Sequence, residues 1–221
     1  MRFSKRKLVA STLILSFVFC LTSCGGFKKE VERYSTAFDE LDFKEVEYSD
    51  FKKLKDDSSD LKNGVYVSSS SSEEIKKITK QIDSELDSDD LSGVFLAKKS
   101  NTNQKEDGVN IFEFGSLSFN QSDDAKEYFD KYCKLLDEQV KEYKELEDVN
   151  TITNDSDDNY YTCTIDTDVF GNKRSISYSI YINENIVISL VSISYYDDID
   201  EYNKMIDTVS DKLDLNTKRD R

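Results

Sequence analysis

The sequence predicts an α+β protein, built from an antiparallel sheet with helices packed mainly on one face and a possible internal ββα pseudo-repeat. Over residues 174–182, apolar side chains occupy every second position, which is the period of a half-buried strand. Over residues 122–143 they recur every three or four positions, which is the period of an amphipathic helix. Short turns containing Asn or Gly separate the strand patterns, and this favours hairpins with antiparallel pairing.

The chain begins with the pattern of a secretory signal peptide. Residues 8–20 form an apolar run, and it is preceded by four basic residues: Arg2, Lys5, Arg6 and Lys7. The run is shorter than the roughly 20 apolar residues of a membrane-spanning helix. It ends in Leu-Thr-Ser-Cys-Gly at residues 21–25, which resembles the lipobox of bacterial lipoproteins.

That resemblance implies a processed, lipid-anchored protein. In the family, the cysteine of the motif takes a diacylglyceryl group and the signal peptide is cut before it. Here the cut would remove residues 1–23 and make Cys24 the lipidated first residue of the mature chain, at the cell membrane and facing the extracytoplasmic side. An uncleaved anchor and an ordinary soluble secreted protein are the alternatives.

The mature chain is strongly acidic. Four of the 30 Lys and Arg residues lie in the signal, which leaves 26 against 45 Asp and Glu and a net charge of −19. Nucleic acid and anionic lipid headgroups repel such a surface. We therefore expect no nucleic-acid partner, and we expect attachment to the membrane through the lipid on Cys24 rather than through surface charge.

The residue types that are absent limit the chemistry. The chain has no histidine, which excludes a Ser-His-Asp triad, a Cys-His pair and His-liganded metal sites. It has no glycine-rich phosphate loop, and we predict no cofactor. Cys20 leaves with the signal and Cys24 carries the lipid, so Cys133 and Cys163 remain, either as buried free thiols or as a disulfide.

The first element of the mature chain is predicted to be a helix. Apolar residues follow at helical spacing from Phe27 to Leu41, after a spacer of only Gly25 and Gly26. Either the domain lies close to the membrane or this helix is a stalk. We divide the chain into a signal peptide, an anchor with an N-terminal helix, an α+β extracytoplasmic domain and a charged tail: residues 1–23, 24–48, 49–215 and 216–221.

Short elements follow this helix. We predict a helix after Ser49, a strand over residues 64–68, a helix behind a Ser71-x-x-Glu74 capping box, and strands over residues 94–97 and 109–119. The polar residues 98–108 should form a hairpin loop. The apolar side chains of the last strand change parity at Gly115, so we expect a bulge or bend there.

The second half of the chain is expected to alternate one long helix, three strands and a final helix. Residues 122–143 should lie across the sheet, and residues 150–159 should form an acidic loop. The later elements are predicted at residues 160–169, 174–182, 186–195 and 197–213. The strand over 186–195 is apolar on both sides near its start, which predicts a central position.

The possible pseudo-repeat rests on two segments. Residues 112–136 and 188–213 both run through a strand, a Ser-x-Ser-aromatic motif, an acidic pair and an amphipathic helix. Such units could lie in one sheet or in two small lobes, and a chance likeness of common supersecondary units is the alternative.

The acidic segment offers a weak metal site. Asp155, Asp157 and Asn159 match the first three ligand positions of a calcium loop, and Asp166 falls at the twelfth. The sixth position needs glycine but holds Tyr160, and the twelfth needs a bidentate glutamate. A solvated acidic loop is the alternative.

Three tyrosines give a second weak site. Tyr160, Tyr195 and Tyr196 fall near predicted strand ends, where amphipathic rings can form a recognition patch for sugar or peptide. Such residues also commonly finish a sheet face, which is the alternative.

In overall pattern the chain resembles small uncharacterised lipoproteins of Gram-positive anaerobes, a resemblance that implies no activity. The sequence favours a membrane-anchored extracytoplasmic lipoprotein that acts as a non-catalytic binding or interaction domain for an unknown protein or ligand. A surface hydrolase that uses carboxylates or a bound cation, and a structural envelope component, are the alternatives. The abundance of acids singles out no catalytic pair.

Overall fold

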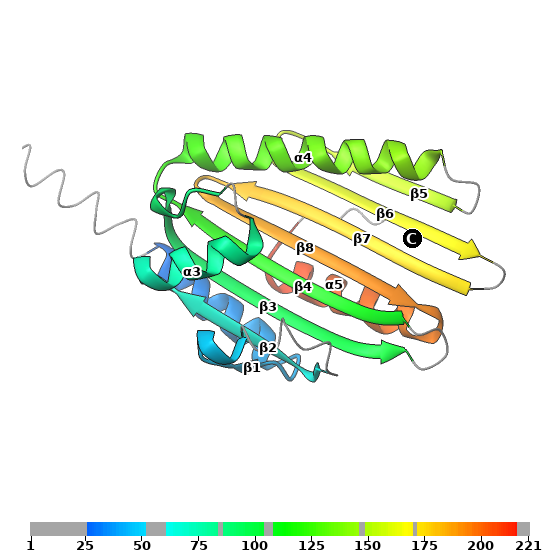
Figure 1. The fold of residues 1–221 in the computed structure, drawn as a ribbon, viewed down its shortest axis with the longest axis horizontal. Coiled ribbons are helices and arrows are strands. Elements are labelled where there is room, and N and C mark those ends of the chain that lie inside the picture. The colour runs from blue at the N-terminus through cyan, green and yellow to red at the C-terminus, as the bar shows by residue number, and fades with distance from the viewer. Residues whose placement is uncertain are drawn as a thin grey trace, which may run out of the picture.

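The computed structural model describes residues 26–51, 61–83, 86–103, 108–145, 149–169 and 172–215. These residues form one eight-stranded sheet with the strand order β1-β2-β3-β4-β8-β7-β6-β5 (Figure 1). β1 pairs with β2 in parallel, and every other neighbouring pair is antiparallel. The strands are β1 (Lys44–Glu45), β2 (Leu61–Ser69), β3 (Leu91–Asn103), β4 (Gly108–Phe119), β5 (Val149–Ser156), β6 (Tyr160–Val169), β7 (Asn172–Asn183) and β8 (Ile186–Tyr195).

The helices surround this sheet. Residues 26–39 and 48–51 are helical, and two short 3-10 turns lie at η1 (Ser88–Asp90) and η2 (Tyr196–Asp198). The longer helices are α3 (Ser72–Ile82), α4 (Ser122–Lys144) and α5 (Ile199–Lys212). No helix among the described residues is long and apolar enough to cross a bilayer.

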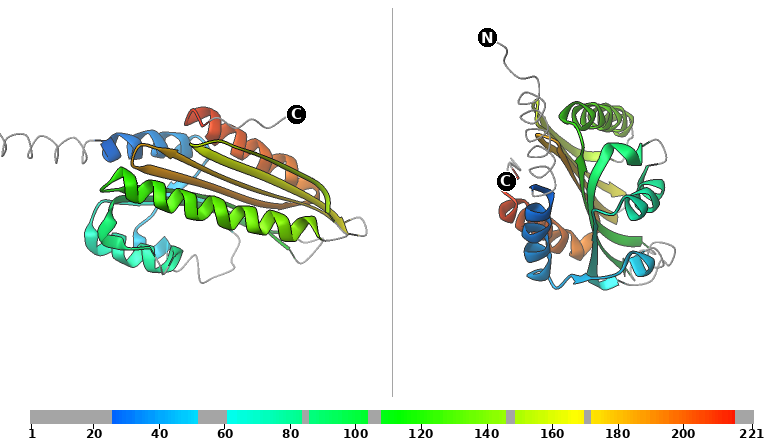
Figure 2. Two further views of the ribbon diagram at one scale, coloured as in Figure 1. Left: turned by 90° about the horizontal axis from the view of Figure 1, so that it is seen from above. Right: turned by 90° about the vertical axis from the view of Figure 1, so that its left-hand side faces the viewer.

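The structure confirms the α+β class and the antiparallel sheet, but the prediction of helices mainly on one face is wrong. α3 and α4 cover one face, here called the front face, and the helix of residues 26–39 and α5 cover the other, the back face (Figure 2). Two large apolar cores result, one on each side of the sheet, and a third, smaller cluster contains Phe51, Val65 and Val67. Strands that are covered on both sides carry apolar residues at both parities, and a single sequence cannot assign each parity to a face.

β4 is a strand that is covered on both sides and carries apolar residues at both parities. Phe112 and Phe114 lie in the back core, whereas Leu117 and Phe119 lie in the front core. Pairing of β4 with β3 and β8 is unbroken on either side of Gly115, so the expected bulge there is absent. The change of parity reflects a change in the covering helix, not a change in the backbone.

The helix of residues 26–39 belongs to the back core and is not a free stalk. Tyr34 and Phe38 are fully buried in it. The ring of Phe38 lies 5.0 Å from that of Phe114 and 5.7 Å from that of Phe95, centroid to centroid. Such aromatic contacts fix the helix against β3 and β4.

A glycine allows the start of this helix to approach the sheet. A Cβ atom on Gly93 of β3 would lie 2.2 Å from the ring of Phe27, closer than any real carbon contact. The position therefore requires glycine so that Phe27, which is 5% exposed, can pack flat on β3.

Several other elements differ from the predictions. The expected acidic loop over residues 150–159 contains β5, and β3 continues through much of the expected hairpin loop to Asn103. α3 begins after Ser71 as predicted, but the capping box does not form: Glu74 accepts a hydrogen bond from Ser69 Oγ at 2.7 Å instead. β8 lies between β4 and β7, so its central position is confirmed.

The pseudo-repeat is not seen. The helix that follows β4 lies on the front face, and the helix that follows β8 lies on the back face (Figure 2). Both segments belong to one continuous sheet, so the two-lobe reading is wrong for the described residues.

Candidate functional site

A cavity of about 390 Å³ opens on the back face, at the end of the sheet where β7 passes into β8. Four separate parts of the chain enclose it: the helix of residues 26–39, the β5–β6 turn, the β7–β8 hairpin and the segment that ends α5. We call this the back-face pocket. Its lining combines tyrosine rings, isoleucine and leucine side chains, asparagine amides and charged groups.

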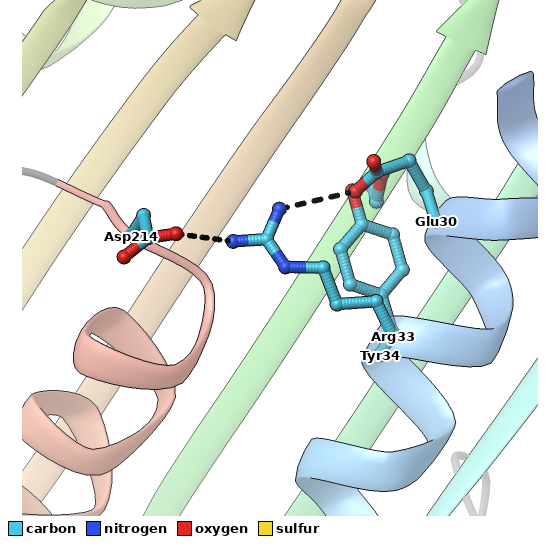
Figure 3. Close-up of polar contacts among 5 residues, drawn as sticks. Glu30, Arg33, Tyr34 and Asp214 are labelled. Atoms are coloured by element: carbon cyan, nitrogen blue, oxygen red, sulfur yellow. Dashed lines mark hydrogen bonds and ion pairs between the residues drawn. The ribbon is translucent and has the colours of Figure 1, made fainter.

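Arg33 lies at this pocket between two carboxylates (Figure 3). Its Nη1 is 3.5 Å from Glu30 Oε2, and its Nη2 is 3.4 Å from Asp214 Oδ2. Both distances exceed the usual 2.7–2.9 Å of charge-assisted bonds, so the guanidinium fork is loosely held. The Arg33 side chain is 38% exposed, which leaves it accessible to a ligand.

Asp214 reaches Arg33 because of the way α5 ends. Its φ is 48°, in the left-handed region, and the amide of Leu215 donates to the carbonyl of Ser210 at 2.8 Å. This is a helix C-terminus of the Schellman type, in which glycine is the usual residue at the left-handed position. Together with the Lys212–Glu40 ion pair, the Arg33–Asp214 pair joins α5 to the segment of residues 26–40.

Tyr34 forms a rigid wall beside Arg33. Its hydroxyl accepts a hydrogen bond from Ser116 Oγ at 3.2 Å, and its side chain is fully buried. Burial is the main reason why the pKa of Tyr34 is raised above its ordinary value, so this hydroxyl stays neutral.

Two further tyrosines line the pocket from neighbouring strands. Tyr160 of β6 and Tyr181 of β7 pair in register, and their ring centroids are 6.4 Å apart. Tyr160 donates a hydrogen bond from its hydroxyl to Asp155 Oδ2 at 2.9 Å, and this bond is the main cause that raises the pKa of Tyr160. The predicted site residue Tyr160 therefore lies at a cavity, held by a residue from the proposed calcium loop.

The four residues of that loop do not converge. Asp157 Oδ1 accepts hydrogen bonds from the amides of Asn159 and Tyr160, which closes the β5–β6 turn. Asp155 pairs with Thr162, whereas Asp166 lies four residues further along β6, about 13 Å away at normal strand rise. Among the described residues, no group of three or more His, Cys, Asp or Glu is placed to hold a metal ion.

Tyr195 does not join Tyr160. It pairs with Arg174, seven residues along β7 from the partner of Tyr160, or about 23 Å at normal strand rise. The guanidinium of Arg174 lies 5.5 Å from the ring of Tyr195. The side chain of Tyr196 lies outside the described part of the chain.

Cys133 and Cys163, which were predicted to be buried thiols or a disulfide, are both free thiols. Cys163 is 2% exposed and Cys133 is half-buried, and both belong to the front core. Burial raises the pKa of each thiol to about 11, which makes both poor nucleophiles near neutral pH. Cys24, the predicted lipidation site, lies outside the described residues.

A second cavity, of about 260 Å³, lies on the front face. We call it the front groove. α4 contributes Tyr128 and Tyr132, whose ring centroids are 5.0 Å apart, and β3 and β4 contribute the ion pair Lys98–Glu113 at 2.9 Å. Most of its lining is apolar.

Sequence reasoning did not identify Arg33, Tyr181 or Asp214. Arg33 and Asp214 are 181 residues apart, and only the packing of α5 brings them together. One signal was present, because Arg33 and Arg174 are the two arginines between the signal peptide and the charged tail of a lysine-rich chain. Arginine in such a setting points to a paired or binding role.

No protein-family profile matches the chain, and no curated protein matches it. Among solved structures, the chain is similar to the extracellular domain of PknH from Mycobacterium tuberculosis, at 9% sequence identity and a TM-score of 0.36. The match covers 57% of this chain and 66%, just under two thirds, of that chain. A likeness at this level says nothing about ligand or activity. The fold and the cavities therefore define an α+β domain with a polar pocket on one face and an apolar groove on the other.

Proposed function

We propose that the chain is a membrane-anchored extracytoplasmic lipoprotein whose domain acts as a non-catalytic binding module, with the back-face pocket as its binding site. The observation that carries this proposal is the position of the pocket relative to Cys24. Residue 26, the first described, is two residues from Cys24 and so at most about 7 Å from it. Arg33 follows seven residues along a helix, or about 10 Å further.

This spacing along the chain limits the distance between Cys24 and the back-face pocket. The backbone of Arg33, at the wall of the back-face pocket, would lie within about 18 Å of the lipidated residue, whatever the conformation of Gly25. The lipid anchor would then act as the tether that concentrates the pocket at the membrane surface.

The charged groups of the pocket support binding rather than hydrolysis. A carboxylate pair that cleaves a glycosidic bond flanks the bond with an open space between the two groups. In this pocket the guanidinium of Arg33 occupies the space between Glu30 and Asp214. That arrangement suits the positioning of a ligand.

Chemical cross-linking on intact cells, followed by mass spectrometry, tests this function. We expect the native protein to capture a partner molecule that both Cys24→Ala and Tyr160→Ala lose. Tyr132→Ala in the front groove is the matched control, because Tyr132 is also a half-buried tyrosine at a cavity. Capture that is unchanged in Tyr160→Ala but lost in Tyr132→Ala would move the site to the front groove. If the protein captures only other copies of itself, the alternative of a structural envelope component would be favoured.

A further inference from the structure

We infer that the back-face pocket takes a neutral saccharide. This inference rests on the proposed function and names the ligand class of that same site. It follows from three properties of the lining: the arrangement of donors and acceptors, the tyrosine surface beside them, and the sign of the local charge.

The first property is the alternation of donors and acceptors. The guanidinium of Arg33 presents N–H donors between the acceptor carboxylates of Glu30 and Asp214, at 3.5 and 3.4 Å. Asn159 and Asn183 line the same cavity, and each amide carries donors and an acceptor. A sugar hydroxyl both donates and accepts, so neighbouring hydroxyls on a ring match such an array better than a group that only accepts or only donates.

The second property is an apolar surface that matches the size of a sugar ring. Tyr160 is half-buried at the cavity, and its hydroxyl is already engaged by Asp155 at 2.9 Å. Its ring is thereby held in one orientation beside Tyr181, with centroids 6.4 Å apart. A ring held in one orientation beside polar groups provides the contact for the C–H face of a pyranose. The volume of about 390 Å³ falls within the range of small-molecule pockets.

The third property is the charge, which disfavours an anion. The formally charged groups of the lining are Arg33 and three carboxylates, those of Glu30, Glu184 and Asp214. An anionic ligand would meet a net negative pocket in a mature chain that is itself strongly acidic. A cationic ligand would meet Arg33 between the two nearest carboxylates. A neutral polar ligand avoids both penalties.

Ligand-observed saturation-transfer NMR on the full chain carrying Cys24→Ala tests the inference. The probes are maltotriose, cellotriose and N,N′,N″-triacetylchitotriose, with a phosphorylated sugar and trilysine as charged comparisons. We expect at least one neutral trisaccharide to give saturation transfer, and we expect Tyr160→Ala and Arg33→Gln each to weaken its apparent affinity at least tenfold. Tyr132→Ala should leave that affinity unchanged.

Circular dichroism and the thermal midpoint of each variant show whether it remains folded, and a folded variant with lost binding supports the site. The inference is overturned if none of the neutral trisaccharides binds, if the phosphorylated sugar or trilysine binds more tightly, or if binding is insensitive to Tyr160→Ala and Arg33→Gln. If these probes fail while the cellular capture still depends on Tyr160, the ligand class is wrong and the proposed function stands.

Discussion

Asp214 combines a backbone role and a side-chain role at one position. Its left-handed φ of 48° is unfavourable for a residue with a side chain, yet its carboxylate is the one that reaches Arg33 from α5. Because the Asp214 side chain is 95% exposed, its ion pair with Arg33 contributes little to stability. A residue that is costly for the backbone and weak as a stabiliser is better explained by the pocket that it lines.

We therefore expect Asp214→Gly to raise the free energy of unfolding by about 0.5 to 1 kcal/mol, because glycine adopts this conformation without strain. Chemical denaturation of the full chain measures this free energy of unfolding. The same substitution should weaken ligand capture at the back-face pocket. A clear loss of stability would show that the ion pair matters more than the backbone strain.

The two free thiols make a pH-dependent contribution to stability. Burial raises the pKa of Cys133 and Cys163 to about 11, above the ordinary value of about 8.5. The folded state then holds its thiol protons at a pH at which the unfolded state has lost them. The stabilisation is complete below about pH 8.5 and is lost as the pH rises through 11.

The midpoint of denaturation should therefore fall as the pH is raised from 8 to 11. Cys163→Ala should make this fall with pH less steep. Alkylation at pH 8, followed peptide by peptide with mass spectrometry, should label Cys163 far more slowly in the folded chain than in denaturant. Equal labelling rates in the two states would contradict its burial at 2% exposure.

At the scale of elements, the helix of residues 26–39 links the anchor to the pocket. It carries Glu30, Arg33 and Tyr34, and it is held by Phe27 on Gly93 at its start and by Phe38 in the back core. Its position decides where the pocket lies relative to Cys24.

Phe38→Ala should lower the free energy of unfolding by about 3 to 5 kcal/mol, because Phe38 is fully buried among aromatic rings. Leu135→Ala, at the exposed large apolar residue on α4, should change it by less than about 0.5 kcal/mol. A small effect of Phe38→Ala on the unfolding midpoint would mean that this helix is not part of the cooperative core.

Gly93→Ala tests the docking of the helix start. The added Cβ would lie 2.2 Å from the Phe27 ring, which forces the ring or the helix to move. We expect a cost of about 1 to 3 kcal/mol in unfolding free energy. Gly115→Ala is the control: its Cβ would lie 2.9 Å from Ser189 Oγ, the end of a small side chain, and it should cost less. The reverse order of the two costs would contradict this account.

Strong periodicity made many elements predictable. The alternation over residues 174–182 and the helical spacing over residues 122–143 correspond to β7 and α4. β5 was missed because its sequence, Val149–Ser156, is polar and acidic like a loop. It is an edge strand whose order comes from pairing with β6, and polar edge strands also resist pairing with other chains.

The candidate site was predictable only in part. Tyr160 was singled out because it begins a predicted strand, and the structure places it at the back-face pocket. Arg33 and Asp214 escaped prediction because their contact depends on α5 packing on the back face, and the sequence alone suggested that the helices lie mainly on one face. The alternation of apolar residues identifies a strand, but it does not show which face of the sheet a given helix will cover.

At the scale of the whole molecule, the two faces of the sheet have different roles in this account. α3 and α4 cover the front face, and the helix of residues 26–39 lies on the back face (Figure 2). The apolar groove lies on the front face and the polar pocket on the back face. A lipid on Cys24 would place the second of these next to the membrane, while the acidic surface keeps the domain in solution above it.

The proposed anchor makes a separate prediction. Cells grown with an alkyne-tagged fatty acid should label the native protein, and Cys24→Ser should abolish that label and release the protein from the membrane fraction. Labelling that survives Cys24→Ser would contradict the anchor and, with it, the proposed position of the back-face pocket beside the membrane.

Photo-cross-linking from within the two cavities tests whether the back-face pocket is the binding site. A photoreactive phenylalanine analogue placed at position 160 or at position 132 of the lipidated, full-length protein reports which cavity holds a ligand on intact cells. We expect a covalent adduct of defined mass at position 160 and none at position 132. An adduct at position 132 alone, or at neither position, would contradict it.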